Sequence, residues 1–204
     1  MTDANPNARM AAFSDGVFAF ALTLLIIDVR LPADAHITST PELWHALWLL
    51  MPTFLAFLLS FGIILITWVN HHGALDLVKR STPSLVFANG FLLLTVVLIP
   101  FPTALLGEFL LTDHATPAVV VYDAVLALQA IGWILMTGSA LKHNLLINAH
   151  AVAAAKDNYR KAFFACAFYA SLAIVAFWIP LIVAIVTLVS WILWLVQGIR
   201  LKRG

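Results

Sequence analysis

Long apolar segments alternate with short polar connections along the whole chain. An apolar helix of about 20 residues is long enough to cross the hydrocarbon core of a bilayer. Six segments of this kind occur, at residues 12–31, 43–70, 85–106, 118–141, 162–179 and 181–199. The pattern predicts an all-α integral membrane protein with six transmembrane helices, organised as one domain over residues 1–204.

The last two apolar segments are separated only by Pro180. A single helix over residues 162–199 would be about 57 Å long at 1.5 Å per residue, which is too long for one crossing. Basic residues flank both ends of this stretch: Arg160, Lys161, Arg200, Lys202 and Arg203. We therefore expect two crossings joined by a tight turn near Pro180.

The composition agrees with this pattern and excludes several classes of protein. Apolar residues make up 63% of the 204 positions and charged residues only 10%, and the mean hydropathy is +0.99. A soluble domain has roughly 25% charged residues, so this chain cannot cover a soluble surface. A soluble enzyme and a disordered chain are excluded. The single cysteine, Cys166, excludes an intrachain disulfide and a multi-cysteine metal cluster.

The charged residues are distributed unequally between the two sides of the expected membrane domain. Ten of the eleven basic residues fall on the side that holds both termini: Arg9, Lys79, Arg80, Lys142, Lys156, Arg160, Lys161, Arg200, Lys202 and Arg203. The other side has Arg30 and five acidic residues: Asp28, Asp34, Glu42, Glu108 and Asp113. The positive-inside rule predicts that both termini are cytoplasmic. The acidic outer face either attracts cations or only reflects the exclusion of basic residues.

The first segment also has a feature of signal peptides, because the apolar run Val17–Ile27 is followed by Ala33-Asp34-Ala35. However, Asp15 interrupts the start of the apolar run, and Arg9 is the only basic residue ahead of it. Cleavage would also leave five crossings and disturb the charge asymmetry. We expect the segment to be retained as the first transmembrane helix.

Polar residues lie at the cytoplasmic ends of the first three segments, where charged groups need a partner. Arg9 and Asp15 are six residues apart, so they do not stack on one helix face, and each is expected to pair with another helix. We expect a polar network that includes Ser14, Asp15, Trp68, Asn89 and either His71 or His72. The same residues are also consistent with ordinary contacts between helices, and Trp68 alone is typical of an interfacial anchor.

Other chemistry is not supported by the spacing of polar residues. Adjacent histidines on a helix point about 100° apart, and no carboxylate lies beside the histidines at a ligand spacing, so we expect no metal, haem or other cofactor. The sequence lacks the G-x-S-x-G motif of hydrolases and the T-V-G-Y-G filter of potassium channels. Asp123, near the outer end of the fourth segment, is a weak candidate for a proton or ion site.

Thr23 is the one polar residue deep in the first segment, and it borders an apolar stripe formed by Phe20, Leu24 and Ile27. Because nearly every residue in this segment is apolar, periodicity alone favours ordinary packing or lipid contact for these four residues. A motif in the same helix changes this interpretation. Residues 13–19 read Phe-Ser-Asp-Gly-Val-Phe-Ala, with Arg9 four positions before Phe13.

This R-x-x-x-F-S-D-G motif resembles the signature of the transmembrane protein 175 family, the lysosomal potassium channels of animals and their bacterial relatives. Trp68-x-x-His71-His72, Asn89 and Pro100-Phe101-Pro102-Thr103 resemble the family in the same order along the chain. The resemblance covers the first three helices well. The last three helices resemble the family only in number, length and charge.

The resemblance implies six helices per repeat without a re-entrant pore loop, and a homotetramer for a bacterial chain with one repeat. Four copies of the first helix would line a central pore. Phe20, Leu24 and Ile27 would form its apolar constriction, and Thr23 would supply a hydroxyl that favours potassium. Phe20 departs from the isoleucine or leucine common at that position. A network of eight residues would orient the pore helix: Arg9, Phe13, Ser14, Asp15, Trp68, His71, His72 and Asn89.

We therefore expect a potassium-selective, leak-type channel of a bacterial inner membrane, not an enzyme, with potassium as its permeant ion. A proton-coupled transporter that uses Asp15 or Asp123 is the main alternative, although the sequence shows no inverted repeat. A membrane scaffold without transport activity is a third alternative. No nucleic-acid partner is expected, and the lipid bilayer and further copies of the chain are the expected partners.

Overall fold

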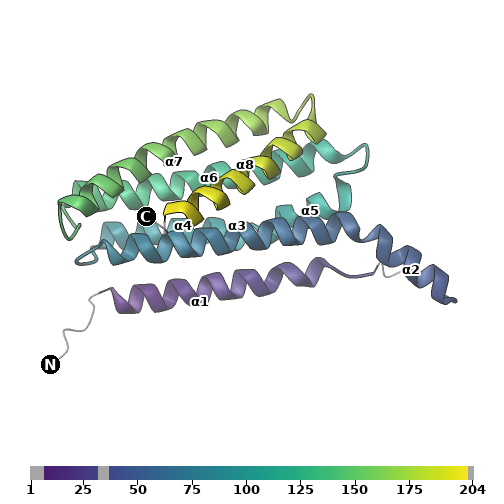
Figure 1. Ribbon diagram of the computed structural model, residues 1–204, viewed down its shortest axis with the longest axis horizontal. Helices are drawn as coiled ribbons and strands as arrows, with labels where there is room; N and C mark the ends of the chain where they lie inside the picture. The colour runs from purple at the N-terminus through teal and green to yellow at the C-terminus, as the bar shows by residue number, and fades with distance from the viewer. Residues whose placement is uncertain (1–6, 32–36, 202–204) are drawn as a thin grey trace.

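The computed structural model describes residues 7–31 and 37–201, and most of these residues are helical (Figure 1). The helices are α1 (Ala8–Leu24), the 3-10 turn η1 (Leu25–Asp28), α2 (Thr40–Leu49), α3 (Met51–Asp76), α4 (Pro83–Leu98), α5 (Pro100–Phe109), α6 (Ala115–Lys142), α7 (Ala149–Val175) and α8 (Pro180–Leu201). Within the described ranges, four helical stretches are long and apolar enough to cross a membrane: Ala8–Asp28, Met51–Asp76, Pro83–Phe109 and Ala115–Lys142.

Proline residues divide two of the expected helices into shorter ones. The segment expected at 43–70 bends at Leu50, and its long part, α3, begins at Met51 and continues to Asp76. Pro52 explains the bend, because it lacks the N–H that would continue the helical hydrogen bonds of α2. The segment expected at 85–106 likewise bends at Ile99, immediately before Pro100. Figure 1 shows α2 extending beyond the end of the helix bundle.

The region 142–161, expected to be a polar connection, is helical from Ala149 onward. The Asn148 side chain caps this helix, because its Oδ1 accepts a hydrogen bond from the Ala151 N–H at 2.8 Å. The alanine-rich sequence that follows has a high helix propensity. Helix α7 ends at Val175, and after a short turn Pro180 begins α8, where its missing N–H is not needed.

Helix α6 lies at the centre of the bundle and contacts α4, α5, α7 and α8. Glycine permits a close approach of α6 to α4, because a Cβ at Gly132 would lie 2.9 Å from the Leu92 Cα of α4. Gly107 of α5 allows a similar approach to Thr53 of α3. Helix α1 lies at the edge of the bundle and packs on α3 and α4 (Figure 1).

The two connections at one end of the bundle are joined to each other. Val78 and Leu146 form an antiparallel bridge, and the Lys79 N–H donates to the Leu145 carbonyl at 2.8 Å. Asn144 precedes this bridge with a φ of 51°, a conformation that asparagine tolerates better than most residues. The Nδ2 of Asn7 donates to the Val78 carbonyl at 2.6 Å, which fixes the start of α1 at the same end.

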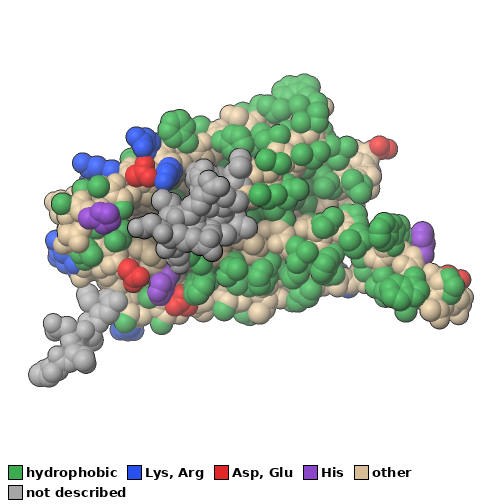
Figure 2. All heavy atoms as spheres, in the orientation of Figure 1, with side chains coloured by type: hydrophobic (Ala, Val, Ile, Leu, Met, Phe, Trp, Pro, Cys, Tyr) green, Lys and Arg blue, Asp and Glu red, His purple; other side chains and the backbone are tan. Residues whose placement is uncertain are grey.

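The basic residues gather at this end of the bundle, as Figure 2 shows, and we call it the basic end. It includes Lys79 and Arg80 of the connection before α4, Lys142 at the end of α6, and Arg160 and Lys161 of α7. Glu42 and Glu108 belong to helices near the opposite end. Asp34, Lys202 and Arg203 lie outside the described residues.

We predict that Gly132→Ala destabilises the bundle by about 1–3 kcal/mol, because its methyl group would overlap the backbone of Leu92. The thermal unfolding temperature of the purified protein in detergent measures the effect. Gly62→Ala is the matched control, because no atom lies within 4 Å of a Cβ built there. An equal unfolding temperature for the two variants would contradict the close approach of α4 and α6.

Candidate functional site

Helix α1 has one buried face and one face that no other described residue covers. Ser14, Phe18 and Ala21 are buried against the bundle, and Leu25 continues this face into η1. The opposite face carries Phe13, Gly16, Phe20, Thr23 and Ile27, which are exposed. We call these five residues the open face. Their spacing of three or four residues keeps them on one side of the helix.

A chain of hydrogen bonds connects the buried face of α1 to α4 and α3. Nε2 of His71 lies 2.6 Å from Oδ1 of Asn89, and the Nδ2 of Asn89 donates to the Ser14 Oγ at 3.1 Å. The Ser14 hydroxyl in turn donates to the Met10 carbonyl at 2.8 Å. Because the Asn89 oxygen can only accept, His71 must donate from Nε2. All three of these side chains are buried.

A second connection lies one residue further along α1. The indole Nε1 of Trp68 donates to Asp15 Oδ1 at 2.8 Å. A hydrogen bond to a carboxylate is stronger than one between neutral groups. Trp68 is therefore hydrogen-bonded to α1. A simple interfacial anchor would not need this bond.

The two connections together fix the rotation of α1 about its axis. Ser14 and Asp15 are adjacent, so their side chains point about 100° apart, and one is bonded to Asn89 of α4 while the other is bonded to Trp68 of α3. A rotation of α1 in either direction would break at least one of these bonds. The open face is therefore held away from the bundle.

Three residues expected in this network make none of its hydrogen bonds in the described part of the chain. Arg9 and Phe13 are exposed on α1, and the Phe13 side chain is 65% exposed. His72 is also exposed, and its ring lies 6.2 Å from the ring of Trp68. Its Nε2 lies 4.0 Å from Asp76, one turn further along α3, so a carboxylate does lie beside this histidine, contrary to the expectation from the sequence. The sequence left the choice between the two histidines open, and the structure places His71 in the network.

The residues expected to form a constriction differ in their exposure. Phe20 is 62% exposed and Ile27 is 58% exposed, whereas Leu24 is only half-buried at the margin of the open face. The Thr23 side chain is exposed, and its hydroxyl donates to the Phe20 carbonyl at 2.8 Å. Because the hydroxyl proton is used in this bond, the Thr23 oxygen presents lone pairs to whatever meets the open face.

Asp123 lies away from α1. It is fully buried in α6, and its Oδ1 accepts a hydrogen bond from the Thr187 hydroxyl of α8 at 2.8 Å. A separate polar cluster joins α3, α5 and α6, where Thr103 donates to Ser60 at 2.6 Å and Ser60 lies 3.0 Å from the Tyr122 hydroxyl. Thr103 belongs to the Pro-Phe-Pro-Thr motif noted in the sequence.

Sequence reasoning missed three residues that support the network. Asn7 fixes the start of α1, and the rings of Phe18 and Trp133 lie 5.3 Å and 6.4 Å from the ring of His71. Phe18 lies four residues after Ser14, so the helical period could have identified it as part of the same buried face. No comparable signal in the sequence relates Trp133 to His71.

Comparison with known proteins gives consistent matches. Residues 9–100 match the family model described as endosomal/lysosomal potassium channel TMEM175. A protein of Chamaesiphon minutus named as a potassium channel is 46% identical over 123 residues, which is 60% of each chain. A potassium channel of Streptomyces collinus is 44% identical over 136 residues, 63% of this chain and 64% of that protein. These matches span less than two thirds of the length of either relative.

A solved structure resembles nearly the whole chain. The crystal structure of a lysosomal potassium-selective channel TMEM175 homolog from Chamaesiphon minutus superposes with a TM-score of 0.83 and 33% sequence identity. The match covers 94% of this chain and 97% of that one. It therefore extends beyond the first three helices to α6, α7 and α8.

We predict that Trp68→Phe lowers the stability of the protein by about 1–3 kcal/mol, because the aromatic ring is kept while the bond to Asp15 is lost. Thermal unfolding in detergent measures the change. Trp44→Phe is the matched control, because Trp44 is 69% exposed on α2. Equal unfolding temperatures for the two variants would show that the bond to Asp15 contributes nothing.

Proposed function

The chain belongs to the TMEM175 family, a family of ion channels rather than enzymes, and from this premise we propose that it is a potassium-permeable, potassium-selective channel. We propose further that four copies assemble around a central axis, with the open face of α1 lining the pore. The permeant potassium ion is the only small ligand that this function requires.

The single observation that supports this proposal best is the fixed orientation of α1. An apolar helix at the edge of a membrane bundle can meet lipid on its exposed side, and lipid contact does not require a particular rotation. Here Ser14 and Asp15 hold the rotation from two directions. The open face also carries Thr23, whose oxygen lone pairs would find no hydrogen-bond donor or cation among lipid acyl chains. A ring of four Thr23 oxygens would give a cation acceptor atoms.

Six crossings fit the helix lengths, with α7 and α8 as the fifth and sixth. Helix α7 has 27 residues and α8 has 22, and 20 residues suffice for a crossing. The gathering of basic residues at one end of the bundle supports a cytoplasmic position for that end and for both termini (Figure 2). For a bacterial member, the membrane would be the inner membrane.

The pore would control ions through their hydration. A narrow ring of apolar side chains such as Phe20 and Ile27 holds water poorly, and an ion that sheds water there meets a barrier. Potassium holds its water less tightly than sodium, so partial dehydration at this ring favours potassium. Thr23 lies between the two rings along the helix and would replace part of the lost hydration. Permeation would be passive and leak-like, with no coupled ion.

We predict that Phe20→Ala widens the constriction and raises potassium flux several-fold in proteoliposomes. Leu24→Ala should have a smaller effect, because Leu24 lies at the margin of the open face. Phe164→Ala is the matched control, since Phe164 is 70% exposed on α7, at the opposite side of the bundle from α1 (Figure 1). Flux through the Phe20 variant that equals flux through the Phe164 variant would remove Phe20 from the pore.

We predict that Thr23→Ala lowers the ratio of potassium to sodium permeability, while Thr23→Ser, which keeps the hydroxyl, preserves it. Reversal potentials under bi-ionic conditions give this ratio. Thr112→Ala is the control, because the exposed Thr112 hydroxyl also donates to a backbone carbonyl three residues earlier, at 2.9 Å, although its oxygen in addition accepts from the His114 N–H at 3.1 Å. An unchanged ratio in Thr23→Ala would show that this hydroxyl takes no part in selectivity.

A further inference from the structure

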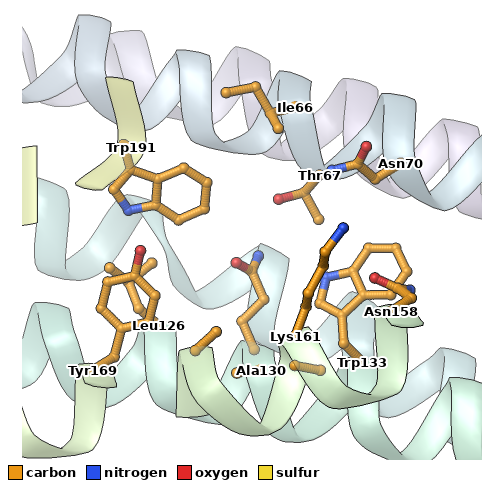
Figure 3. Close-up of a pocket in the computed structure, with 13 residues that line it drawn as sticks. Ile66, Thr67, Asn70, Leu126, Ala130, Trp133, Asn158, Lys161, Tyr169 and Trp191 are labelled. Carbon is orange, nitrogen blue, oxygen red and sulfur yellow. The ribbon is translucent and has the colours of Figure 1, made fainter. Parts of the chain in front are cut away.

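A cavity of about 130 Å³ lies between α3, α6, α7 and α8, and no described residue of α1 lines it (Figure 3). Its lining includes the polar side chains of Asn70, Gln129, Asn158 and Lys161, together with the indole rings of Trp133 and Trp191. Of these six residues, only Trp133 contacts the network that orients α1, through its ring 6.4 Å from the ring of His71. A cavity of this size with several polar groups is large enough for more than a single water molecule.

Two side chains that line the cavity carry hydrogen-bond donors without an acceptor among the described residues. Gln129 is 4% exposed, and its Nε2 has no hydrogen-bond partner among the described residues. The indole Nε1 of Trp191 is also buried without a partner in that part of the chain. A buried donor is normally paired in a folded protein, and leaving it unpaired is unfavourable. An occupant that accepts hydrogen bonds would satisfy these groups.

The charge at the cavity favours an anion over a cation. The Lys161 ammonium extends from α7 toward Thr67 and Asn70 of α3 (Figure 3). Its Nζ lies 2.7 Å from one oxygen of Asp157, and an Arg160 nitrogen lies 2.8 Å from the other oxygen. One acidic and two basic side chains give this group of three a net charge of +1. Asp157 stays paired with Arg160 when Lys161 binds another anion.

A second cavity, of about 280 Å³, continues from the first toward the basic end. The two cavities share Asn70, Asn158 and Lys161. The second is lined largely by apolar side chains, among them Leu77 and Met136. Polar and apolar space therefore adjoin at Lys161, with the apolar cavity on the side of the basic end.

We propose that this crevice binds a phosphate group, with Lys161 supplying the positive charge and the Gln129 amide a hydrogen bond. Phosphate is rich in acceptors and anionic, so it satisfies both the unpaired donors and the ammonium. Anionic membrane lipids carry such a phosphate. Free phosphate shares the same chemistry, and the experiment below separates the two sources.

The test measures ligand binding to the purified full-length protein after removal of lipid. Phosphatidylglycerol, diacylglycerol without a phosphate, and inorganic phosphate are titrated separately. Bound lipid is counted per subunit by native mass spectrometry, and the unfolding temperature is measured in parallel. The variants are Lys161→Gln, Gln129→Leu and the control Lys156→Gln, which removes an exposed charge from the same helix outside the lining of either cavity.

We expect phosphatidylglycerol, but not diacylglycerol, to bind and to raise the unfolding temperature. Lys161→Gln should weaken this binding about tenfold, because a charge-assisted bond is lost, and Lys156→Gln should not. Gln129→Leu should weaken binding without lowering the unfolding temperature of the lipid-free protein, because it removes an unpaired buried amide. A merely structural role for Gln129 would not produce that combination.

Equal binding to the Lys161 and Lys156 variants, or equal binding of diacylglycerol and phosphatidylglycerol, would overturn the proposal. A Lys161-dependent effect of inorganic phosphate, with no additional effect of the lipid, would support the phosphate site and assign it to free phosphate. Binding is measured without ion flux. A failure here therefore leaves the channel function untouched, and a protein that conducts no potassium still tests this site.

Discussion

The orientation of α1 depends on two hydrogen bonds made by adjacent residues. Ser14 accepts from Asn89 of α4, and Asp15 accepts from Trp68 of α3. In the low dielectric of a membrane bundle such hydrogen bonds are strong, and breaking them would leave buried donors and acceptors unpaired, which is unfavourable. Because the two side chains point in different directions, the pair resists rotation both ways. This constraint determines which residues of α1 lie on the open face.

The same bundle uses apolar surface for two purposes. Around α6, apolar side chains and close glycine contacts hold the helices together, and the outer faces of α7 and α8 expose large apolar residues as lipid-facing helices do. On α1 the apolar residues of the open face are interrupted by Gly16 and by the Thr23 hydroxyl. Under the proposed function, this face meets water and ions, where apolar rings act by excluding water rather than by packing.

The sequence predicted the parts of the fold and site that depend on local pattern. Apolar length predicted an all-helical membrane protein, and the F-S-D-G motif pointed to the family. The helix breaks at Leu50 and Ile99 were missed, because the prediction relied on apolar length and apolar residues continue through both positions. Pro52 and Pro100 interrupt the helices through their backbone, which apolar length does not detect. The helical start of α7 was missed because charged residues near Lys156 obscured an alanine-rich helix with an asparagine cap.

Long-range geometry could not be read from residue order. The choice of His71 over His72 depends on which side of α3 faces Asn89, and adjacent positions on a helix are equally compatible with the sequence. The exposure of Phe13 and the half-burial of Leu24 also follow from the rotation of α1, which only tertiary contacts determine. The crevice at Gln129 requires four helices to meet, and no short motif encodes that arrangement.

Cysteine accessibility along α1 tests the central claim most directly. In a Cys166→Ser background, single cysteines at Gly16, Thr23 and Ile27 are compared with a cysteine at Ala21 on the buried face, and potassium current is recorded while a positively charged thiol reagent is applied. The account predicts that the reagent blocks current at the three open-face positions and has no effect at Ala21. Block at Ala21, or current unaffected at all three open-face positions, would contradict it.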